Sequence, residues 1–126
     1  MPRNTHSARG RTPLIFVIDD DHTHAQLLAR RLGSMGFKAR SSQVIPQIVT
    51  PDDILIIDFG VLVALEPVNQ ELASHAHLIV TTGSRNRATQ VTAAQLGCSH
   101  VVIKPIDFEA LVQALDQAHK RPRSAI

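Results

Sequence analysis

Short apolar runs recur along the chain and are separated by longer amphipathic stretches. The runs are rich in β-branched residues and carry no polar position, which is the pattern of strands buried on both faces of a parallel sheet. They comprise Leu14–Ile18, Ile54–Ile57, Leu78–Val80 and Val101–Ile103. A further and more polar stretch, Lys38–Ser42, predicts an edge strand.

The stretches between these runs predict helices. Apolar residues recur at helical spacing after Thr23, and Gly36 supplies a stop signal. Residues 87–96 form a second helical stretch, and a third begins at Asp107, whose carboxylate suits an N-cap. The alternation of strand and helix along the chain predicts an α/β protein with an open, doubly wound, five-stranded parallel sheet.

Two stretches predict weaker helical structure. Residues 64–74 suggest a broken helix that Pro67 interrupts. Residues 43–52 contain Pro46 and Pro51, which allow at most one helical turn. One face of the sheet should therefore have thinner cover than the other, and apolar residues there are expected to be open to a partner. These are Val44, Ile48 and Leu62.

The composition is that of one globular domain. The chain has 126 residues, of which 44% are hydrophobic and 19% charged, so a single core can form without a second domain. Its apolar runs are too short to cross a bilayer, and its basic start does not resemble a signal peptide. The single cysteine, Cys98, excludes an internal disulfide and suits a small buried thiol. We therefore expect a cytoplasmic protein that makes no membrane contact.

The basic charge is confined to the two ends of the chain. Residues 1–13 carry three arginines and no acid, and residues 120–126 carry three basic residues and no acid. The segment between them has seven basic against eleven acidic residues. We expect a folded domain over 14–119 with basic flexible tails at 1–13 and 120–126. No nucleic-acid partner is expected, because the chain has no Trp or Tyr and four Phe for stacking on bases.

Chemically active side chains follow the strands of the predicted sheet. Asp19, Asp20 and Asp21 follow the first strand, and Asp58 closes the third. In open α/β sheets the ligand site lies beyond the carboxyl ends of the strands, so these acids should share one edge. Asp21 is the candidate N-cap of the following helix. Crowded carboxylates repel one another and are held ionised by a divalent cation, and an all-oxygen site favours Mg²⁺.

Thr82-Gly83 closes the fourth strand, and Val-Ile-Lys104-Pro105 closes the fifth. Together with the acid pair after the first strand and the lone Asp58, these motifs resemble the signature of response-regulator receiver domains. The similarity runs from about Leu14 to Ala118 and implies the flavodoxin-like strand order 2-1-3-4-5.

The resemblance also implies a role for each site residue. Asp58 would accept a phosphoryl group, while Asp19, Asp20, Asp58 and the backbone carbonyl of Gly60 would hold Mg²⁺. The hydroxyl of Thr82 would move to the phosphoryl group, and Lys104 would be its cationic partner. The protein would then be a switch with slow self-dephosphorylation rather than an enzyme. Its partners would be a histidine kinase or histidine phosphotransfer protein and an unidentified downstream target, with a homodimer as an open alternative.

The sequence departs from the receiver pattern in three places. The residues after Asp58 continue apolar as Phe59–Val63, where the family has a Met-Pro and Asp-Gly turn, and this bears on the Gly60 carbonyl. The segment 43–52 is short. Val101 stands where many receivers carry an aromatic residue that rotates with the threonine.

Two alternative functions remain open. The shortened segments favour a receiver-like docking module that is not phosphorylated. The run Asp19-Asp20-Asp21-His22-Thr23 also fits a haloacid-dehalogenase-like phosphatase, in which Asp19 would attack and Asp21 would serve as acid and base. That family's second acid pair is missing. The paired histidines are predicted to be surface residues rather than zinc ligands, and His100 a half-buried side chain. The pairs are His22 with His24 and His75 with His77.

Overall fold

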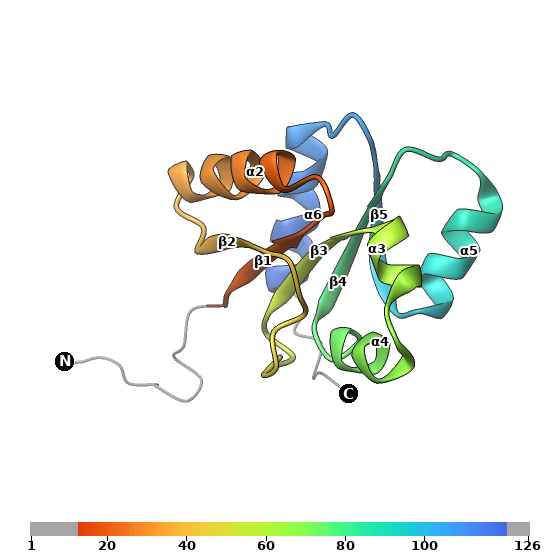
Figure 1. The fold of residues 1–126 in the computed structure, drawn as a ribbon. Helices are drawn as coiled ribbons and strands as arrows, with labels where there is room; N and C mark the ends of the chain where they lie inside the picture. The colour runs from red at the N-terminus through yellow and green to blue at the C-terminus, as the bar shows by residue number, and fades with distance from the viewer. Residues whose placement is uncertain (1–12, 121–126) are drawn as a thin grey trace.

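The computed structural model describes residues 13–120, which form a parallel sheet with helices on both faces (Figure 1). The strands are β1 (Ile15–Ile18), β2 (Ala39–Ser42), β3 (Ile54–Asp58), β4 (His77–Thr82) and β5 (Cys98–Ile103). The helices are α2 (His22–Ser34), α3 (Phe59–Ala64), α4 (Pro67–Ala73), α5 (Arg87–Gln95) and α6 (Phe108–Lys120). No helix within residues 13–120 is long and apolar enough to cross a membrane.

The strand order is β2-β1-β3-β4-β5, which confirms the predicted topology. All neighbouring strands are parallel. β1 and β4 are buried along their whole length and β3 is buried up to Asp58, while β2 is a partly exposed edge strand. The order reverses direction between β1 and β3, so their carboxyl ends border the crevice where α/β proteins place their ligands.

Alternate residues of each strand pack into two separate cores. Ile15 and Val17 of β1 join Leu111 and Leu115 in a core under α2 and α6. Phe16 and Ile18 face the other way, into a core covered by α3, α4 and α5. This alternation follows from the period-two geometry of a strand, and it explains why the apolar runs of the sequence carry no polar position.

The ends of the helices carry the caps that the sequence predicts. The side chain of Asp21 accepts a hydrogen bond from the backbone N–H of His24 at 3.1 Å, which confirms Asp21 as the N-cap of α2. The carboxylate of Asp107 accepts from the N–H groups of Glu109 and Ala110 at the start of α6. Gly36 has a φ of 96°, a left-handed conformation that a side chain would strain.

The predicted broken helix over 64–74 is wrong in its bounds. The first helix, α3, starts at Phe59, directly after β3, because the carboxylate of Asp58 accepts the N–H of Val61 and caps it. Pro67 does not interrupt this helix but opens a separate one, α4. Proline is well tolerated there, since the first turn of a helix has no use for its missing N–H.

The segment 43–52 contains no helix, in agreement with its two prolines. Ile45 is buried in the core on the α3–α5 face, and Val49 packs against it. Val44 and Ile48 are exposed, as expected. The expectation that Leu62 is open to a partner is wrong: its side chain is fully buried, because α3 forms and turns it into the core.

Cys98 lies partly buried at the start of β5, and burial raises the pKa of its thiol, which keeps it in the less reactive protonated form. His100 is half-buried, as predicted, and its Nε2 lies 2.8 Å from Oε1 of Gln117 on α6.

Candidate functional site

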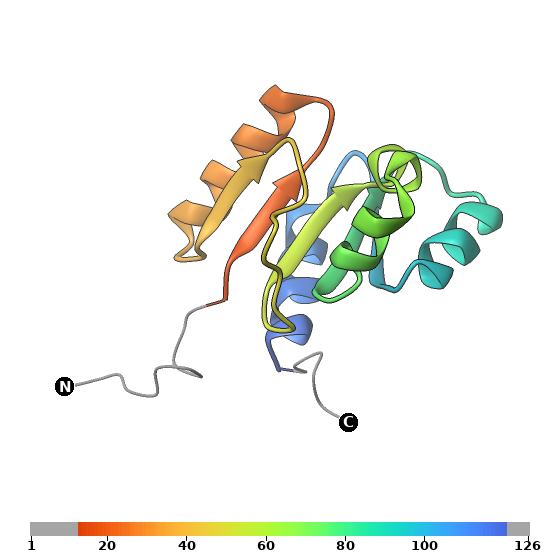
Figure 2. The same ribbon diagram turned by 60° about the horizontal axis from the view of Figure 1, so that its bottom comes forward.

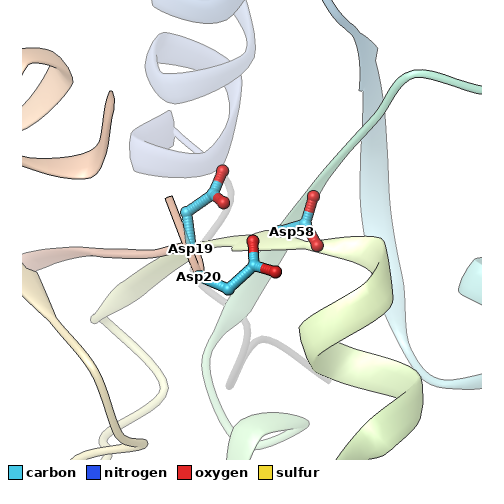
Figure 3. Close-up of side chains that lie close together, drawn as sticks. All are labelled: Asp19, Asp20 and Asp58. Carbon is cyan, nitrogen blue, oxygen red and sulfur yellow. The ribbon is translucent and has the colours of Figure 1, made fainter. Parts of the chain in front are cut away.

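Four parallel strands deliver the candidate residues to one edge of the sheet. Asp19 and Asp20 follow β1, Asp58 ends β3, Thr82 ends β4 and Lys104 follows β5. The register places Ile18 beside Ile57, so the acids that follow these two residues emerge side by side. Figure 3 shows the carboxylates of Asp19, Asp20 and Asp58 gathered at the ends of β1 and β3.

Lys104 connects two of these acids. Its ammonium group donates to Oδ1 of Asp58 at 2.7 Å and to Oδ2 of Asp19 at 3.0 Å. Partial burial alone would lower the pKa of Lys104. The hydrogen bonds to Asp58 and Asp19 outweigh it and hold the pKa above its ordinary value. The ammonium is therefore fully charged at neutral pH.

Asp19 is the buried member of the acid set, with 5% of its surface exposed. Burial tends to raise the pKa of its carboxyl group. Hydrogen bonds from the N–H of Asp21 and from Lys104 oppose burial, and the net effect lowers the pKa of Asp19. The carboxylate therefore stays ionised in a place where an unpaired charge would be costly.

The three aspartates form an oxygen-rich cluster that suits a divalent cation. One carboxylate oxygen from each lies within 4.8 Å of the others. Asp20 is exposed, and an open cavity that Asp19, Asp20 and Gly60 help to line leaves room for water ligands. A set of carboxylates with adjacent water is the donor chemistry of Mg²⁺ and Ca²⁺, so the residues present fit such an ion.

The role of the Gly60 carbonyl as a metal ligand stays a prediction. Gly60 lies in the first turn of α3, where backbone carbonyls point along the helix axis toward its C-terminal end and away from Asp58. A Cβ atom at Gly60 would lie 3.1 Å from Oδ2 of Asp58, so glycine leaves space beside that carboxylate. Ligation by this carbonyl would require the first turn of α3 to open.

Thr82 is buried and belongs to a network that the sequence analysis missed. Its hydroxyl oxygen accepts the N–H of Ser84 at 3.1 Å. The hydroxyl oxygen of Ser84 in turn accepts the N–H of Asn86 at 3.0 Å and the hydroxyl of Thr89 at 3.2 Å. Because the side chain of Asn86 caps α5, these bonds connect the end of β4 to the start of that helix. The Ser-x-Asn run after Gly83 was the available signal, since such residues commonly bond to nearby backbone.

His24 was also missed as a neighbour of the site. Its Nδ1 lies 3.4 Å from Oδ2 of Asp19. His22 instead lies beside Gln43, with 3.3 Å between Nδ1 and Nε2. Neither histidine belongs to the group of residues within 13–120 that could hold a metal ion.

Known proteins resemble the chain in fold. No family model matches the sequence. The acid tolerance regulatory protein ActR of Rhizobium meliloti (strain 1021) is 26% identical in an alignment of 129 positions that covers 91% of this chain. The chain spans 66% of the length of that relative, just under two thirds.

Solved structures resemble the chain over most of its length. The non-phosphorylated HemR receiver domain from Leptospira biflexa has a TM-score of 0.68 at 16% identity, covering 91% of this chain and 100% of that one. A response regulator from Burkholderia pseudomallei with a phosphorylated aspartic acid, a calcium ion and citrate has a TM-score of 0.64 at 21% identity. That match covers 90% of this chain and 76% of that one. The chain therefore has the fold of response-regulator receiver domains.

The acid cluster predicts a stabilising effect of Mg²⁺. When the concentration of the free ion is about ten times its dissociation constant, an ion that binds only the folded chain adds about 1.4 kcal/mol to the free energy of unfolding. We expect a rise of a few degrees in Tm by calorimetry, and Asp20→Asn should abolish most of it.

Asp21→Asn is the matched control, because Asp21 is adjacent and exposed but caps α2. It should change the baseline stability by at most about 1 kcal/mol and keep the gain from Mg²⁺. An unchanged Tm with Mg²⁺, or an equal loss of the gain in both variants, would contradict a metal site at Asp20.

Proposed function

We propose that the chain is a response regulator that accepts a phosphoryl group from a phosphohistidine onto Asp58, with Mg²⁺ held by Asp19, Asp20 and Asp58. The observation that carries this proposal is the 2.7 Å hydrogen bond from Lys104 to Asp58 at the edge of a cluster of three carboxylates. This contact supports a site in which the ammonium group of Lys104 stabilises the negative charge that a phosphoryl group would add at Asp58. The solved structure with a phosphorylated aspartic acid and a calcium ion shows that this fold can carry both groups.

The transfer joins an anionic nucleophile to an anionic phosphoryl group. A carboxylate oxygen of Asp58 forms the new P–O bond while the P–N bond to the donor histidine breaks, and the imidazole leaves with the electron pair of that bond and takes up a proton. Lys104 donates to Asp58 and could also donate to the phosphoryl oxygens as they approach that carboxylate. Mg²⁺ would supply further charge neutralisation there. Water would later cleave the acyl phosphate, so the switch would reset slowly.

Thr82 is the residue that we expect to contact the new phosphoryl group. Its hydroxyl lies at the end of β4, the neighbour of β3, and in this state accepts from Ser84. Movement of the hydroxyl toward phosphoryl oxygens would break that bond and loosen the connection through Ser84 and Thr89 to α5. Val101 in β5 offers no ring to rotate, so the response would pass through this hydroxyl network.

One observation favours a second candidate, a docking module that is not phosphorylated. Val44 and Ile48 are exposed on a face with reduced helical cover, and such residues serve protein contacts. The phosphatase alternative finds less support. The carboxylate of Asp21 is occupied in capping α2, and Asp58, which that reaction would not use, holds Lys104.

We propose a histidine kinase or a histidine phosphotransfer protein as the donor of the phosphoryl group. A protein target would bind the phosphorylated chain downstream. Phosphoryl transfer between such partners takes place in the cytoplasm, so we propose that location for this chain.

Chemical trapping tests the proposed acceptor. Incubation with acetyl phosphate and Mg²⁺, followed by borohydride reduction and peptide mapping, should label Asp58. Asp58→Asn should abolish labelling, and Lys104→Met should lower its rate by about 100-fold or more, because the cation beside the attacking oxygen is lost.

Asp21→Asn serves as the control and should label at the rate of the unchanged chain. Label on Asp19 that persists in Asp58→Asn would overturn the receiver proposal in favour of the phosphatase. The absence of label with both acetyl phosphate and a phosphohistidine donor would favour the docking module.

The hydroxyl network predicts where the switch responds. On addition of beryllofluoride with Mg²⁺, we expect large amide shifts from Gly83 to Thr89 and small ones at Val101, measured by NMR. Thr82→Ala removes the hydroxyl, so the shifts at Ser84 and beyond should fall severalfold while fluorine resonances still report beryllofluoride at Asp58.

Thr92→Ala, a change further along α5, should leave the response intact. A response centred on Val101, or one that Thr82→Ala leaves unchanged, would contradict this route.

A further inference from the structure

One face of the molecule exposes apolar side chains. Of the large apolar side chains that are exposed within residues 13–120, Val44, Ile48, Val63 and Val68 lie between β2 and β4. Ile48 is 81% exposed and Val68 is 70% exposed. Single exposed apolar residues are common and need no explanation, but a group of them on one face does. Here the segments that carry them, 43–52, α3 and α4, cover the same core on one side of the sheet (Figure 2).

The cover on this face is thin because residues 43–52 form irregular chain rather than a helix. Ile45 alone in that segment is buried to the level of the core, and its neighbours Val44 and Ile48 point outward. An open cavity is lined by Gln43, by Val61 and Ala64 of α3, and by Leu65, which follows that helix. The strands beneath are four to six residues long, which corresponds to about 13–20 Å. A helix of about nine to thirteen residues has that length.

The same part of the chain is uniformly acidic. Between Arg40 and Arg85 the sequence contains no Lys or Arg, and its acids include Asp52, Glu66 and Glu71, all exposed. Asp20 is exposed at the edge of the open cavity. On the opposite face, α2 contains Arg30 and Arg31 and no acid, whereas α6 contains Glu109 and Asp116. An occupant of the face between β2 and β4 therefore gains by carrying positive charge.

We propose that this face binds a basic amphipathic helix of a partner protein, which lays its apolar stripe on Val44, Ile48 and Val68 and directs Lys or Arg side chains toward Asp52 and Glu66. This binding mode is the helix-in-groove type, in which apolar anchors recur at helical spacing. The proposal goes beyond phosphoryl transfer, because Val44, Ile48 and Val68 lie outside the Asp19, Asp20 and Asp58 cluster.

The test uses the full chain and a fluorescein-labelled, 14-residue peptide of Leu and Lys, with Leu at i, i+3, i+4 and i+7. We expect saturable binding by anisotropy and amide shifts in segments 43–52, 59–64 and 67–73. Val44→Ser and Ile48→Ser should each weaken binding about tenfold, the effect of losing one anchor. Both positions are exposed, so the NMR spectrum of each variant should report an intact fold.

Leu27→Ser is the matched control, because Leu27 is 58% exposed but lies on α2, on the opposite face. It should leave the affinity unchanged. A peptide with Glu in place of Lys should bind at least about tenfold more weakly, and added salt should weaken binding of the basic peptide. Equal affinity for the acidic peptide, or an equal effect of Leu27→Ser and Ile48→Ser, would overturn the proposal.

Two further measurements exclude other occupants. If the chain sediments as a dimer that Ile48→Ser converts to a monomer, the occupant is a second copy and the proposal is wrong. If replacing Arg3, Arg9 and Arg11 with Gln in the full chain shifts the amide resonances of Val44 and Ile48, the occupant is the chain's own N-terminal segment, and the proposal is again wrong. A monomer whose resonances do not respond supports a separate partner.

Discussion

The ammonium group of Lys104 lies between Asp19 and Asp58 and is the interaction on which the site depends. These residues are far apart in the sequence and meet only because β1, β3 and β5 run parallel and end at the same edge. Without the cation, two ionised carboxylates would face each other with no compensating charge, and one of them is buried. The fold therefore supplies the geometry, and Lys104 allows the acids to remain charged, as the proposed binding of Mg²⁺ and transfer of a phosphoryl group require.

Asp58 has a second attachment that couples the site to the surrounding structure. One of its oxygens accepts from Lys104, and the other caps α3 through the N–H of Val61. A group bound at Asp58 would compete for both contacts, so the start of α3 should respond to the chemistry. That helix also borders the acidic, apolar face between β2 and β4. The proposed switch and the proposed docking face therefore meet at α3, although their residues differ.

Most of the fold follows from local sequence patterns. The apolar runs without polar positions predicted the buried strands, and Asp21 and Asp107 marked the helix starts, because each signal depends on neighbouring residues alone. The start of α3 could not be read in this way: Asp58 was assigned to chemistry, yet it also caps a helix, and Leu62 is consequently buried. The strand-end residues of the site were predictable, whereas the Ser84–Thr89 bond and the contact of His24 with Asp19 depend on the exact approach of side chains.

The central claim is that Lys104, Thr82 and the three aspartates act together on a phosphoryl group at Asp58. A crystal structure of the chain with Mg²⁺ and beryllofluoride tests it most directly. The account predicts beryllium bonded to an oxygen of Asp58, Mg²⁺ held by Asp19, Asp20 and Asp58, and Lys104 and Thr82 both within hydrogen-bond distance of fluorine. Beryllofluoride bonded to Asp19, or a site in which Lys104 stays on Asp58 and no beryllofluoride binds, would contradict it.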